Sequence, residues 1–147
     1  MYRPPEVIIG GDFSDKADVW SAACILWHVA CKRQMFPSPE PKKGDKAPDK
    51  NANQLAEIIG LLGPVPQNIE GRRRRKYFDE FGQLRAPQPV QRPRMVPYLK
   101  YKCGMADDEA VGFANFMKGM VIMDPSKRHS IHQALQHEWL QDLESYT

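Results

Sequence analysis

Residues 17–31 read Ala-Asp-Val-Trp-Ser-Ala-Ala-Cys-Ile-Leu-Trp-His-Val-Ala-Cys and include the longest apolar run of the chain, Ala22 to Trp27. Drawn as a helix, this stretch carries apolar residues on nearly every side. A helix of that kind is normally buried all round. We therefore expect residues 17–31 to form the central helix of the fold, covered by other elements from more than one direction.

The whole chain has the size and composition of one folded domain. It has 147 residues, of which 41% are apolar, enough for a core and too many for a disordered chain. Its net charge of +3 excludes a histone-like polycation. No apolar stretch has signal-peptide length, and none approaches the roughly 18 residues of a membrane span. We expect an intracellular protein of the cytoplasm, the nucleus or both, with no membrane contact.

The segment that follows the central helix contrasts with it. Residues 37–51 contain four prolines and many charges, which predicts an exposed loop. Asn51 or Asn53 can then cap a second helix with an apolar stripe over residues 55–62, ended by Gly63-Pro64.

Residues 63–106 form a basic insert rich in proline and aromatic residues. Between residues 72 and 102, ten basic groups face two acids, a net charge of +8, while the rest of the chain carries −5. Only residues 73–81 have weak helical character. A stretch this long without periodicity is typical of an insertion or lid rather than of core.

The C-terminal third is helical by pattern. Three acids at residues 107–109 favour a helix start, and an apolar face follows over residues 111–120. Ser130 can cap a last helix over residues 131–137. Because no strand pattern is found, we predict a mainly α fold with long loops.

Three cysteines are present, Cys24, Cys31 and Cys103. Three cannot all pair with one another, and none forms a Cys-x-x-Cys motif, so we interpret them as reduced thiols. Cys24 and Cys31 lie on one face of the central helix and should be small core residues. The histidines at 129, 132 and 137 lack the spacing and partners of a zinc site, so we predict no metal site.

Four motifs, in order, resemble the C-terminal lobe of a eukaryotic protein kinase. They are Tyr2-Arg3-Pro4-Pro5-Glu6, like the Ala-Pro-Glu motif; Asp18-Val19-Trp20, like the start of the central helix; Leu61-Leu62-Gly63 with Pro64 and Pro66; and Asp124-Pro125-Ser126-Lys127-Arg128 with His137-Glu138-Trp139-Leu140. The resemblance extends over essentially the whole chain and implies that residues 1–147 are a partial kinase domain, a C-lobe fragment.

Within the kinases, the chain is most similar to the SR-protein kinases, which phosphorylate serines in Arg-Ser repeats of splicing factors. Residues 55–62 and 110–117 are similar to that subfamily, as is the spacing of Gly71, Phe78, Gly82 and Leu84. The Clk-type kinases and the pre-mRNA-processing kinases stay open as close alternatives.

The resemblance implies roles for four structural residues. Glu6 and Arg128 match the buried ion pair that ties the activation segment of kinases to the last helices. Asp18 matches the residue that anchors the backbone of the catalytic loop, with a simple helix N-cap as the alternative. Trp20 matches the tryptophan near the start of the central helix.

The resemblance also implies a substrate pocket and a substrate class. Tyr2, Arg3, Pro4 and Pro5 should line the pocket beside the phosphoacceptor, and the protein substrates should be rich in arginine and serine. The positions aligned with the main docking acids hold Arg33, Asn53 and Gly60, whereas Asp45, Asp49 and Glu57 lie nearby. This departure puts the substrate class in doubt, because an arginine peptide needs carboxylates to pair with.

The groups that perform kinase chemistry do not occur in the sequence. It contains no Gly-x-Gly-x-x-Gly, no Val-Ala-Ile-Lys, no His-Arg-Asp and no Asp-Phe-Gly. We therefore assign no catalytic or cofactor-binding residue to this chain and expect ATP and magnesium only in a full-length parent that supplies the N-lobe and catalytic loop. Alone, the chain should be inactive, and its central helix should expose an apolar patch.

Two other functions remain open from the sequence. The lobe could serve as a non-catalytic interaction module. Alternatively, Arg72 to Lys76 could form a basic patch for nucleic acid, although a solvated helix face explains the run as well.

Overall fold

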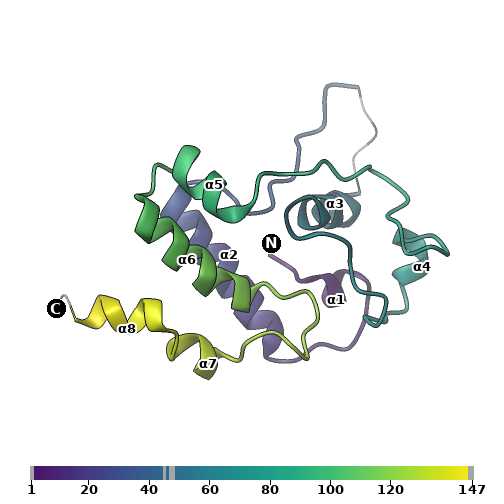
Figure 1. Ribbon diagram of the computed structural model, residues 1–147. Helices are drawn as coiled ribbons and strands as arrows, with labels where there is room; N and C mark the ends of the chain where they lie inside the picture. Colours follow the sequence, from purple (N-terminus) through teal and green to yellow (C-terminus); the bar gives the residue numbers. More distant parts are fainter. Residues whose placement is uncertain (1, 45, 47–48, 146–147) are drawn as a thin grey trace.

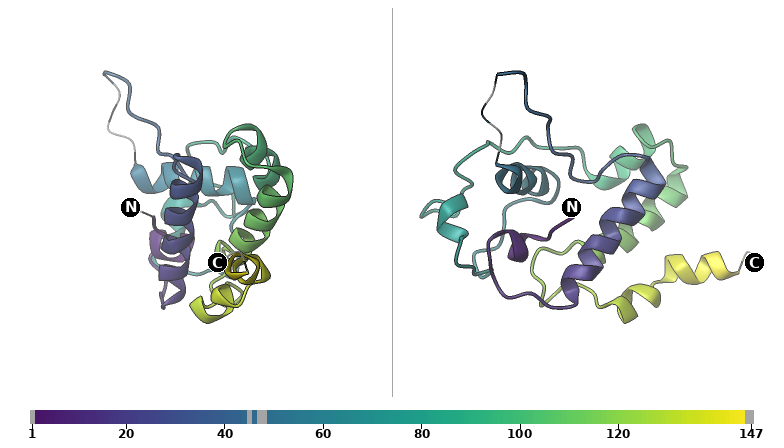
Figure 2. Two further views of the ribbon diagram at one scale, coloured as in Figure 1. Left: turned by 90° about the vertical axis from the view of Figure 1, so that its left-hand side faces the viewer. Right: turned by 180° about the vertical axis from the view of Figure 1, so that it is seen from behind.

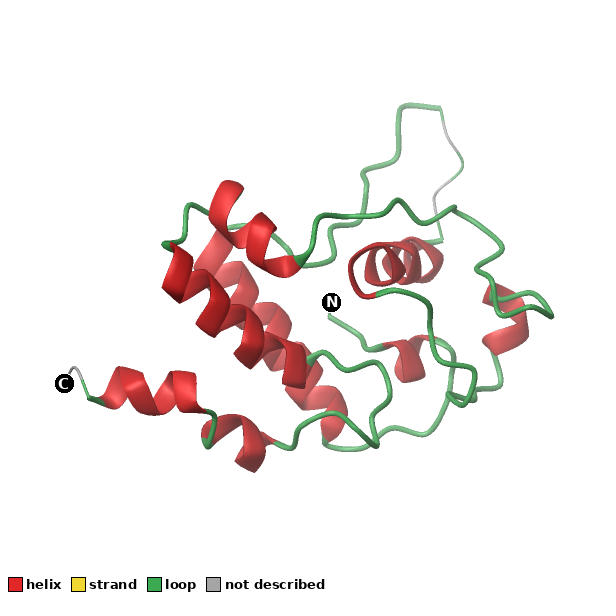
Figure 3. Ribbon diagram, in the orientation of Figure 1, coloured by secondary structure: helices red, strands yellow, loops and turns green. Residues whose placement is uncertain are grey.

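The computed structural model describes residues 2–44, 46 and 49–145, and within these ranges it contains helices and no β-strand (Figure 3). The helices in chain order are α1 (Pro5–Ile8), α2 (Lys16–Cys31), α3 (Lys50–Leu62), α4 (Arg74–Tyr77), α5 (Met95–Tyr101), α6 (Asp107–Met120), α7 (Ile131–Leu135) and α8 (Glu138–Glu144) (Figure 1). One isolated antiparallel bridge joins Phe78 and Leu84. The prediction of a mainly α fold is confirmed.

The core lies where α2 packs beside α6, as Figure 2 shows from two directions. Aromatic rings link the two helices: the centroids of Trp27 and Phe113 are 6.3 Å apart, and Trp139 of α8 lies 5.3 Å from Phe113. Tyr98 of α5 adds a ring 5.6 Å from Trp27. Large buried rings contribute most to such a core, because each removes much apolar surface from water.

Helix α2 is covered on one side only, and its other side agrees with the expectation that the chain alone exposes an apolar patch on this helix. Val19, Trp20 and Trp27 are buried, but Ile25 is 53% exposed and Val29 60% exposed. Leu26 and neighbouring positions continue this exposed side. The described residues therefore leave an apolar face of α2 in solvent, as we expect for an isolated piece of a larger lobe.

The segment 63–106 is part of the core, which corrects its interpretation as an insertion or lid. Its buried side chains are Val65, Ile69, Tyr77, Phe78, Leu84, Met95 and Leu99. The sequence pattern did not predict helix α5, because Pro97 lies within it and proline usually interrupts a helix. This proline occupies the third helical position, where the backbone N–H has no partner within the helix, so the proline is tolerated there.

The boundaries of α3 and α7 depend on side-chain caps. Asp49, not Asn51 or Asn53, caps α3 by accepting hydrogen bonds from the N–H groups of Asn51 and Ala52 at 3.0 and 3.2 Å. The predicted loop 37–51 is exposed over residues 37–44, whereas residues 45, 47 and 48 lie outside the described residues. The cap predicted at Ser130 is confirmed and forms a capping box with Gln133.

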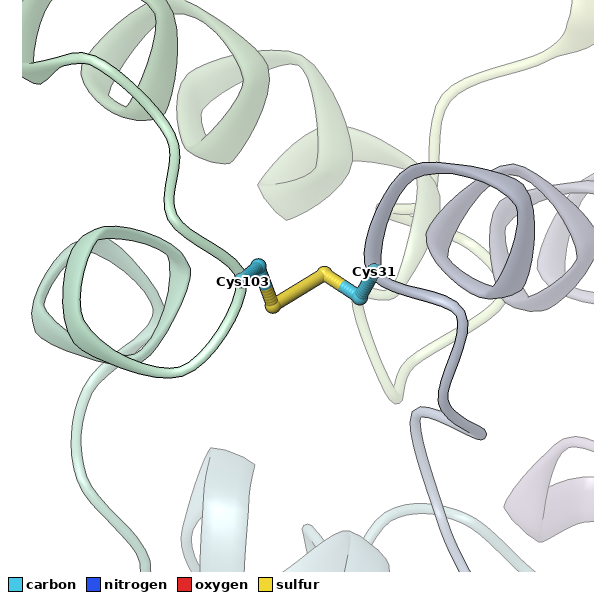
Figure 4. Close-up of a disulfide and its surroundings, with 2 residues drawn as sticks. All are labelled: Cys31 and Cys103. Carbon is cyan, nitrogen blue, oxygen red and sulfur yellow. A yellow bond between two sulfur atoms is a disulfide. The ribbon is translucent and has the colours of Figure 1, made fainter.

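Two of the three cysteines are paired, which corrects the prediction of three reduced thiols. A disulfide joins Cys31, the last residue of α2, to Cys103 in the turn between α5 and α6 (Figure 4). The two Cα atoms lie 4.9 Å apart, inside the usual range for a disulfide. The number of cysteines could not exclude this bond, because three cysteines still allow one disulfide and one free thiol. Cys24 is a buried free thiol, and burial raises its pKa to about 12.

Candidate functional site

The backbone of the N-terminal segment is extended at Pro4 and then forms the short helix α1. Pro5 begins α1, a position where proline is favoured because its fixed φ suits a first turn. Pro4 and Pro5 are both buried, and Ile8 and Ile9 continue into the core. The segment therefore lies at a fixed place beside α3 and α2 (Figure 1).

Glu6 and Arg128 form a buried, two-pronged ion pair. The two terminal nitrogens of Arg128 donate to the two carboxylate oxygens of Glu6 at 2.8 and 3.0 Å. Glu6 is 2% exposed and Arg128 1% exposed. A paired geometry of this kind combines charge with direction and is stronger than a neutral hydrogen bond. The sequence resemblance implied this pairing, and the structure brings the two residues together.

Every N–H group of the Arg128 side chain has an acceptor. Besides Glu6, the guanidinium donates to the carbonyl oxygens of Lys16, Ile122 and Met123 at 2.9, 2.8 and 3.1 Å. The Lys16 ammonium in turn donates to the Arg128 carbonyl at 2.6 Å. These bonds join α1, the start of α2 and the Asp-Pro-Ser-Lys-Arg turn at one point. A buried charge without such partners would be strongly destabilising.

Trp20 and Asp18 occupy different surroundings although they are close in sequence. The Trp20 side chain is fully buried, stacks on Phe36 with ring centroids 5.5 Å apart, and lies under the Arg128 guanidinium at 5.1 Å. Asp18 is exposed in the first turn of α2, and Asp15 is the N-cap residue, so the N-cap alternative for Asp18 was wrong. Among the described residues, no hydrogen bond is found for the Asp18 carboxylate.

A hollow of about 380 Å³ lies beside the N-terminal segment. Of the four residues predicted to contact substrate, two line this hollow and two do not. Tyr2 and Arg3 line the hollow, whereas Pro4 and Pro5 are buried beneath the surface of the segment. The Ser21 hydroxyl donates to the Tyr2 carbonyl at 2.9 Å. Gln54 donates to the Arg3 carbonyl at 3.1 Å. Helices α2 and α3 therefore both hold the backbone of this wall.

The other walls of the hollow come from six residues that the sequence did not mark as part of a site, although Asn51 was a candidate helix cap. They are Gln34, Phe36, Ser38, Lys50, Asn51 and Gln54. They belong to the first part of the α2–α3 connection and to the first turns of α3. No local motif marks them, because only the folding of α3 against α1 brings them beside Tyr2.

The carboxylates near α3 are already engaged by cations of the chain itself. Asp49 lies 3.2 Å from the ammonium of Lys76, and Glu57 lies 3.5 Å from the guanidinium of Arg92. Partial burial disfavours ionised Asp49, but hydrogen bonds from Ala52 and Lys76 outweigh it and lower the pKa. Burial raises the pKa of Glu57, and Arg92 offsets part of this effect.

The three substituted docking positions have distinct surroundings. Arg33 is exposed and Asn53 is buried in α3. Gly60 faces the Val90 carbonyl so closely that any side chain would collide with it. Asp45 lies outside the described residues. Of the acids expected to compensate, the two that the structure describes each hold a partner.

A second polar cluster fixes the turn before Arg128. Asp124 accepts hydrogen bonds from the Ser126 hydroxyl at 2.7 Å, the Ser126 N–H at 2.9 Å and the Asn68 amide at 3.0 Å. The bonds from Ser126 and Asn68 hold the pKa of Asp124 below its usual value. This carboxylate therefore orders the turn that presents Arg128 to Glu6.

Across the described ranges, no group of three or more histidine, cysteine, aspartate or glutamate residues is placed to hold a metal ion. The helices in the same part of the chain include none that is both long and apolar enough to span a bilayer.

Comparison with known proteins gives these features a family context. Residues 1–140 match the protein kinase domain. The chain belongs to the protein kinase family. The matched residues include the Glu6–Arg128 ion pair, the residues that line the hollow beside Tyr2 and the polar turn around Asp124.

Curated relatives of this kinase chain include proteins named SRSF protein kinase and serine/threonine-protein kinase. SRSF protein kinase 3 of Sus scrofa is 32% identical over 142 residues, which is 95% of this chain and 24% of that protein. SKY1 of Saccharomyces cerevisiae is 32% identical over 96% of the chain, and SRPK of Physarum polycephalum is 34% identical over 97%. The chain spans 19% of the length of SKY1 and 33% of that of SRPK. The prediction of an SR-protein-kinase-like sequence is confirmed.

Proposed function

We propose that this chain forms the substrate-docking part of a serine/threonine protein kinase that phosphorylates proteins rich in arginine and serine. The observation that carries the proposal is the wall made by Tyr2 and Arg3, which the Glu6–Arg128 ion pair ties to the C-terminal helices. Relatives named as SRSF protein kinases support the substrate class.

In this proposal, Tyr2 and Arg3 line the pocket beside the serine that receives phosphate. The buried prolines behind them stiffen the segment, because proline fixes φ and reduces the freedom of the chain. The ion pair and the bonds from Ser21 and Gln54 hold the backbone in place. Preordered geometry of this kind is what a phosphoryl-transfer enzyme needs for its protein substrate.

The residues present do not fit a nucleotide–magnesium site. The sequence has neither the glycine-rich loop and lysine that hold phosphates nor the Asp-Phe-Gly carboxylate that holds magnesium. When bound in a complete kinase, ATP supplies the transferred phosphoryl group. We therefore propose that the 147-residue chain alone binds substrate peptides without phosphorylating them.

The substrate's arginines must compete for carboxylates in this chain. The Asp49–Lys76 pair is open to solvent, whereas the Glu57–Arg92 pair is mostly covered. Exposed ion pairs contribute little stability and exchange partners readily. A substrate guanidinium therefore replaces Lys76 at Asp49 more easily than it replaces Arg92 at Glu57.

The proposal is tested with a fluorescent Arg-Ser peptide, ATP and magnesium. We expect the chain to bind the peptide without phosphate transfer, and Tyr2→Ala to weaken binding at least fivefold. Tyr101→Ala serves as the control, because Tyr101 is 80% exposed and does not line the hollow. Phosphate transfer by the chain alone, or full affinity in the Tyr2→Ala variant, would contradict the proposal.

A further inference from the structure

The five basic residues at positions 72–76 divide into two groups with different roles. Arg74 and Lys76 serve the fold itself. The Arg74 guanidinium donates to the carbonyls of Pro66 and Ile69 at 3.2 and 2.6 Å and lies 5.0 Å from the centroid of the Phe78 ring. Lys76 pairs with Asp49. Arg74 and Lys76 are therefore committed to contacts within the chain.

The remaining arginines form what we call the arginine surface: Arg72, Arg73, Arg75 and Arg85. All four are exposed, and no carboxylate among the described residues forms an ion pair with any of them. Arg85 is held near Arg75 by a hydrogen bond from its Nε to the Arg75 carbonyl at 3.2 Å. Four guanidinium groups are thus concentrated around α4, and none of them forms an ion pair with a described carboxylate.

The turn after α1 forms the other half of this surface. The Arg73 N–H donates to the Ile9 carbonyl at 2.8 Å, and the Arg72 N–H donates to the Gly10 carbonyl at 3.4 Å. Gly10 has φ of +74°, and a side chain there would lie within 3.0 Å of the Arg73 Nε and 3.1 Å of the Arg72 Cγ. Glycine therefore leaves room for two arginine side chains over the turn.

Two hollows on this surface combine arginines with carboxylates. One, of about 510 Å³, is lined by Arg72 and Arg75 together with Asp12 and Glu70. The other, of about 430 Å³, is lined by Arg75 and Arg85 together with Asp79 and Glu80. Both hollows also share Arg74 in their lining. Each hollow therefore presents both signs of charge.

This mixture of charges selects among possible ligands. A nucleic acid is uniformly anionic, so the four carboxylates would repel it. A phosphorylated Arg-Ser peptide alternates guanidinium with phosphate and complements both signs. Guanidinium and phosphate form paired, charge-assisted hydrogen bonds, and juxtaposed like charges reject wrong partners.

We propose that the arginine surface binds phosphorylated Arg-Ser peptides, the product of the reaction proposed above. The surface arginines pair with the phosphoserines, and the carboxylates in the two hollows pair with the arginines of the peptide. This inference rests on the proposed function for the identity of the ligand. Its site is distinct from the hollow lined by Tyr2 and Arg3, because the two share no lining residue.

The test measures fluorescence anisotropy of the 147-residue chain with three probes: a four-repeat Arg-Ser peptide with every serine phosphorylated, the same peptide unphosphorylated, and a single-stranded RNA. We expect the phosphorylated peptide to bind at least tenfold more tightly than either other probe. Arg72→Ala/Arg73→Ala/Arg75→Ala should lose at least tenfold in affinity for it. Lys42→Ala/Lys43→Ala/Lys102→Ala removes the same number of exposed charges elsewhere and should stay within twofold of the parent.

The charge-preserving variant Arg72→Lys/Arg73→Lys/Arg75→Lys separates the paired geometry of arginine from its charge. Its affinity should lie between those of the parent and the triple-alanine variant. Circular dichroism checks that each variant is folded. Equal binding of both peptides, an unaffected triple-alanine variant, or tighter binding of RNA would overturn the inference. The assay of the proposed function measures phosphate transfer and binding of the unphosphorylated peptide. If the arginine surface fails to bind the phosphorylated peptide, the result of that assay is unaffected.

Discussion

Glu6 and Arg128 are 122 residues apart in the sequence and meet in a two-pronged ion pair with N–O distances of 2.8 and 3.0 Å. The pair closes nearly the whole chain into one unit, because Glu6 belongs to α1 and Arg128 follows the last turn before α7. We therefore expect the pair to fix the position of the Tyr2–Arg3 wall.

The first prediction concerns this pair. Glu6→Gln should lower the free energy of unfolding by about 3–5 kcal/mol, since it leaves a buried guanidinium without its counter-charge. Denaturant unfolding measures the change. Asp107→Asn is the control, because the Asp107 side chain is 77% exposed and loss of its pair with Lys100 should have little effect. Equal stability of the Glu6→Gln variant and the parent would show that the ion pair does not fasten the N-terminal segment to the rest of the fold.

The second prediction concerns the exposed face of α2. Ile25, Leu26 and Val29 should make the isolated chain self-associate, because an exposed apolar patch is removed from water by association. Val29→Lys should reduce association in analytical ultracentrifugation. Val90→Lys, at a position 78% exposed outside this face, is the matched control. A parent chain that sediments as a stable monomer would contradict the prediction.

The third prediction concerns the disulfide between Cys31 and Cys103. Cys103→Ser, or addition of a dithiol reductant, should lower the free energy of unfolding by about 2–4 kcal/mol, because the bond restricts the unfolded chain across a separation of 72 residues. Cys24→Ser keeps the Cys31–Cys103 bond, so its stability should respond to reductant as that of the parent does, whereas the stability of Cys103→Ser should not. A parent chain whose unfolding midpoint is the same with and without reductant would argue against the bond.

The fourth prediction concerns pH. Because its hydrogen bonds depress the pKa of Asp124, this carboxylate stabilises the fold above its ordinary pKa and loses that contribution as pH falls below it. Asp124→Asn should cost about 1–3 kcal/mol at neutral pH, the cost of losing hydrogen bonds to a charged group. The difference between variant and parent should shrink in acid. Denaturant unfolding at several pH values measures this, and a difference that grows in acid would contradict it.

Local patterns in the sequence were sufficient for the helices with clear periodicity. The cap at Ser130 and the acidic start of α6 were predictable, because both depend on neighbouring residues. Helix α5 was missed because its proline reads as a helix breaker unless its position in the first turn is known. The exposure of Ile25 and Val29 depends on which other elements cover α2, which the pattern of α2 cannot show.

The site was predictable to the extent that motifs carry it. The resemblance to kinases implied the pairing of Glu6 with Arg128, and spacing alone could not have joined residues so far apart. The hollow beside Tyr2 includes Gln34 and Gln54, which no motif marks, because tertiary packing places them there. The sequence likewise could not predict the ion pairs Asp49–Lys76 and Glu57–Arg92, because each pair joins residues from separate segments.

The most direct test of the account is a phosphotransfer assay on a chimera. Residues 1–140 of this chain replace the matching segment of the SKY1 kinase of Saccharomyces cerevisiae, and the product is incubated with magnesium, ATP and an Arg-Ser peptide. We predict phosphate transfer to serine by the chimera and none by the 147-residue chain alone. A folded, ATP-binding chimera that fails to phosphorylate the peptide, or one that prefers serine peptides without arginine, would contradict the proposed function.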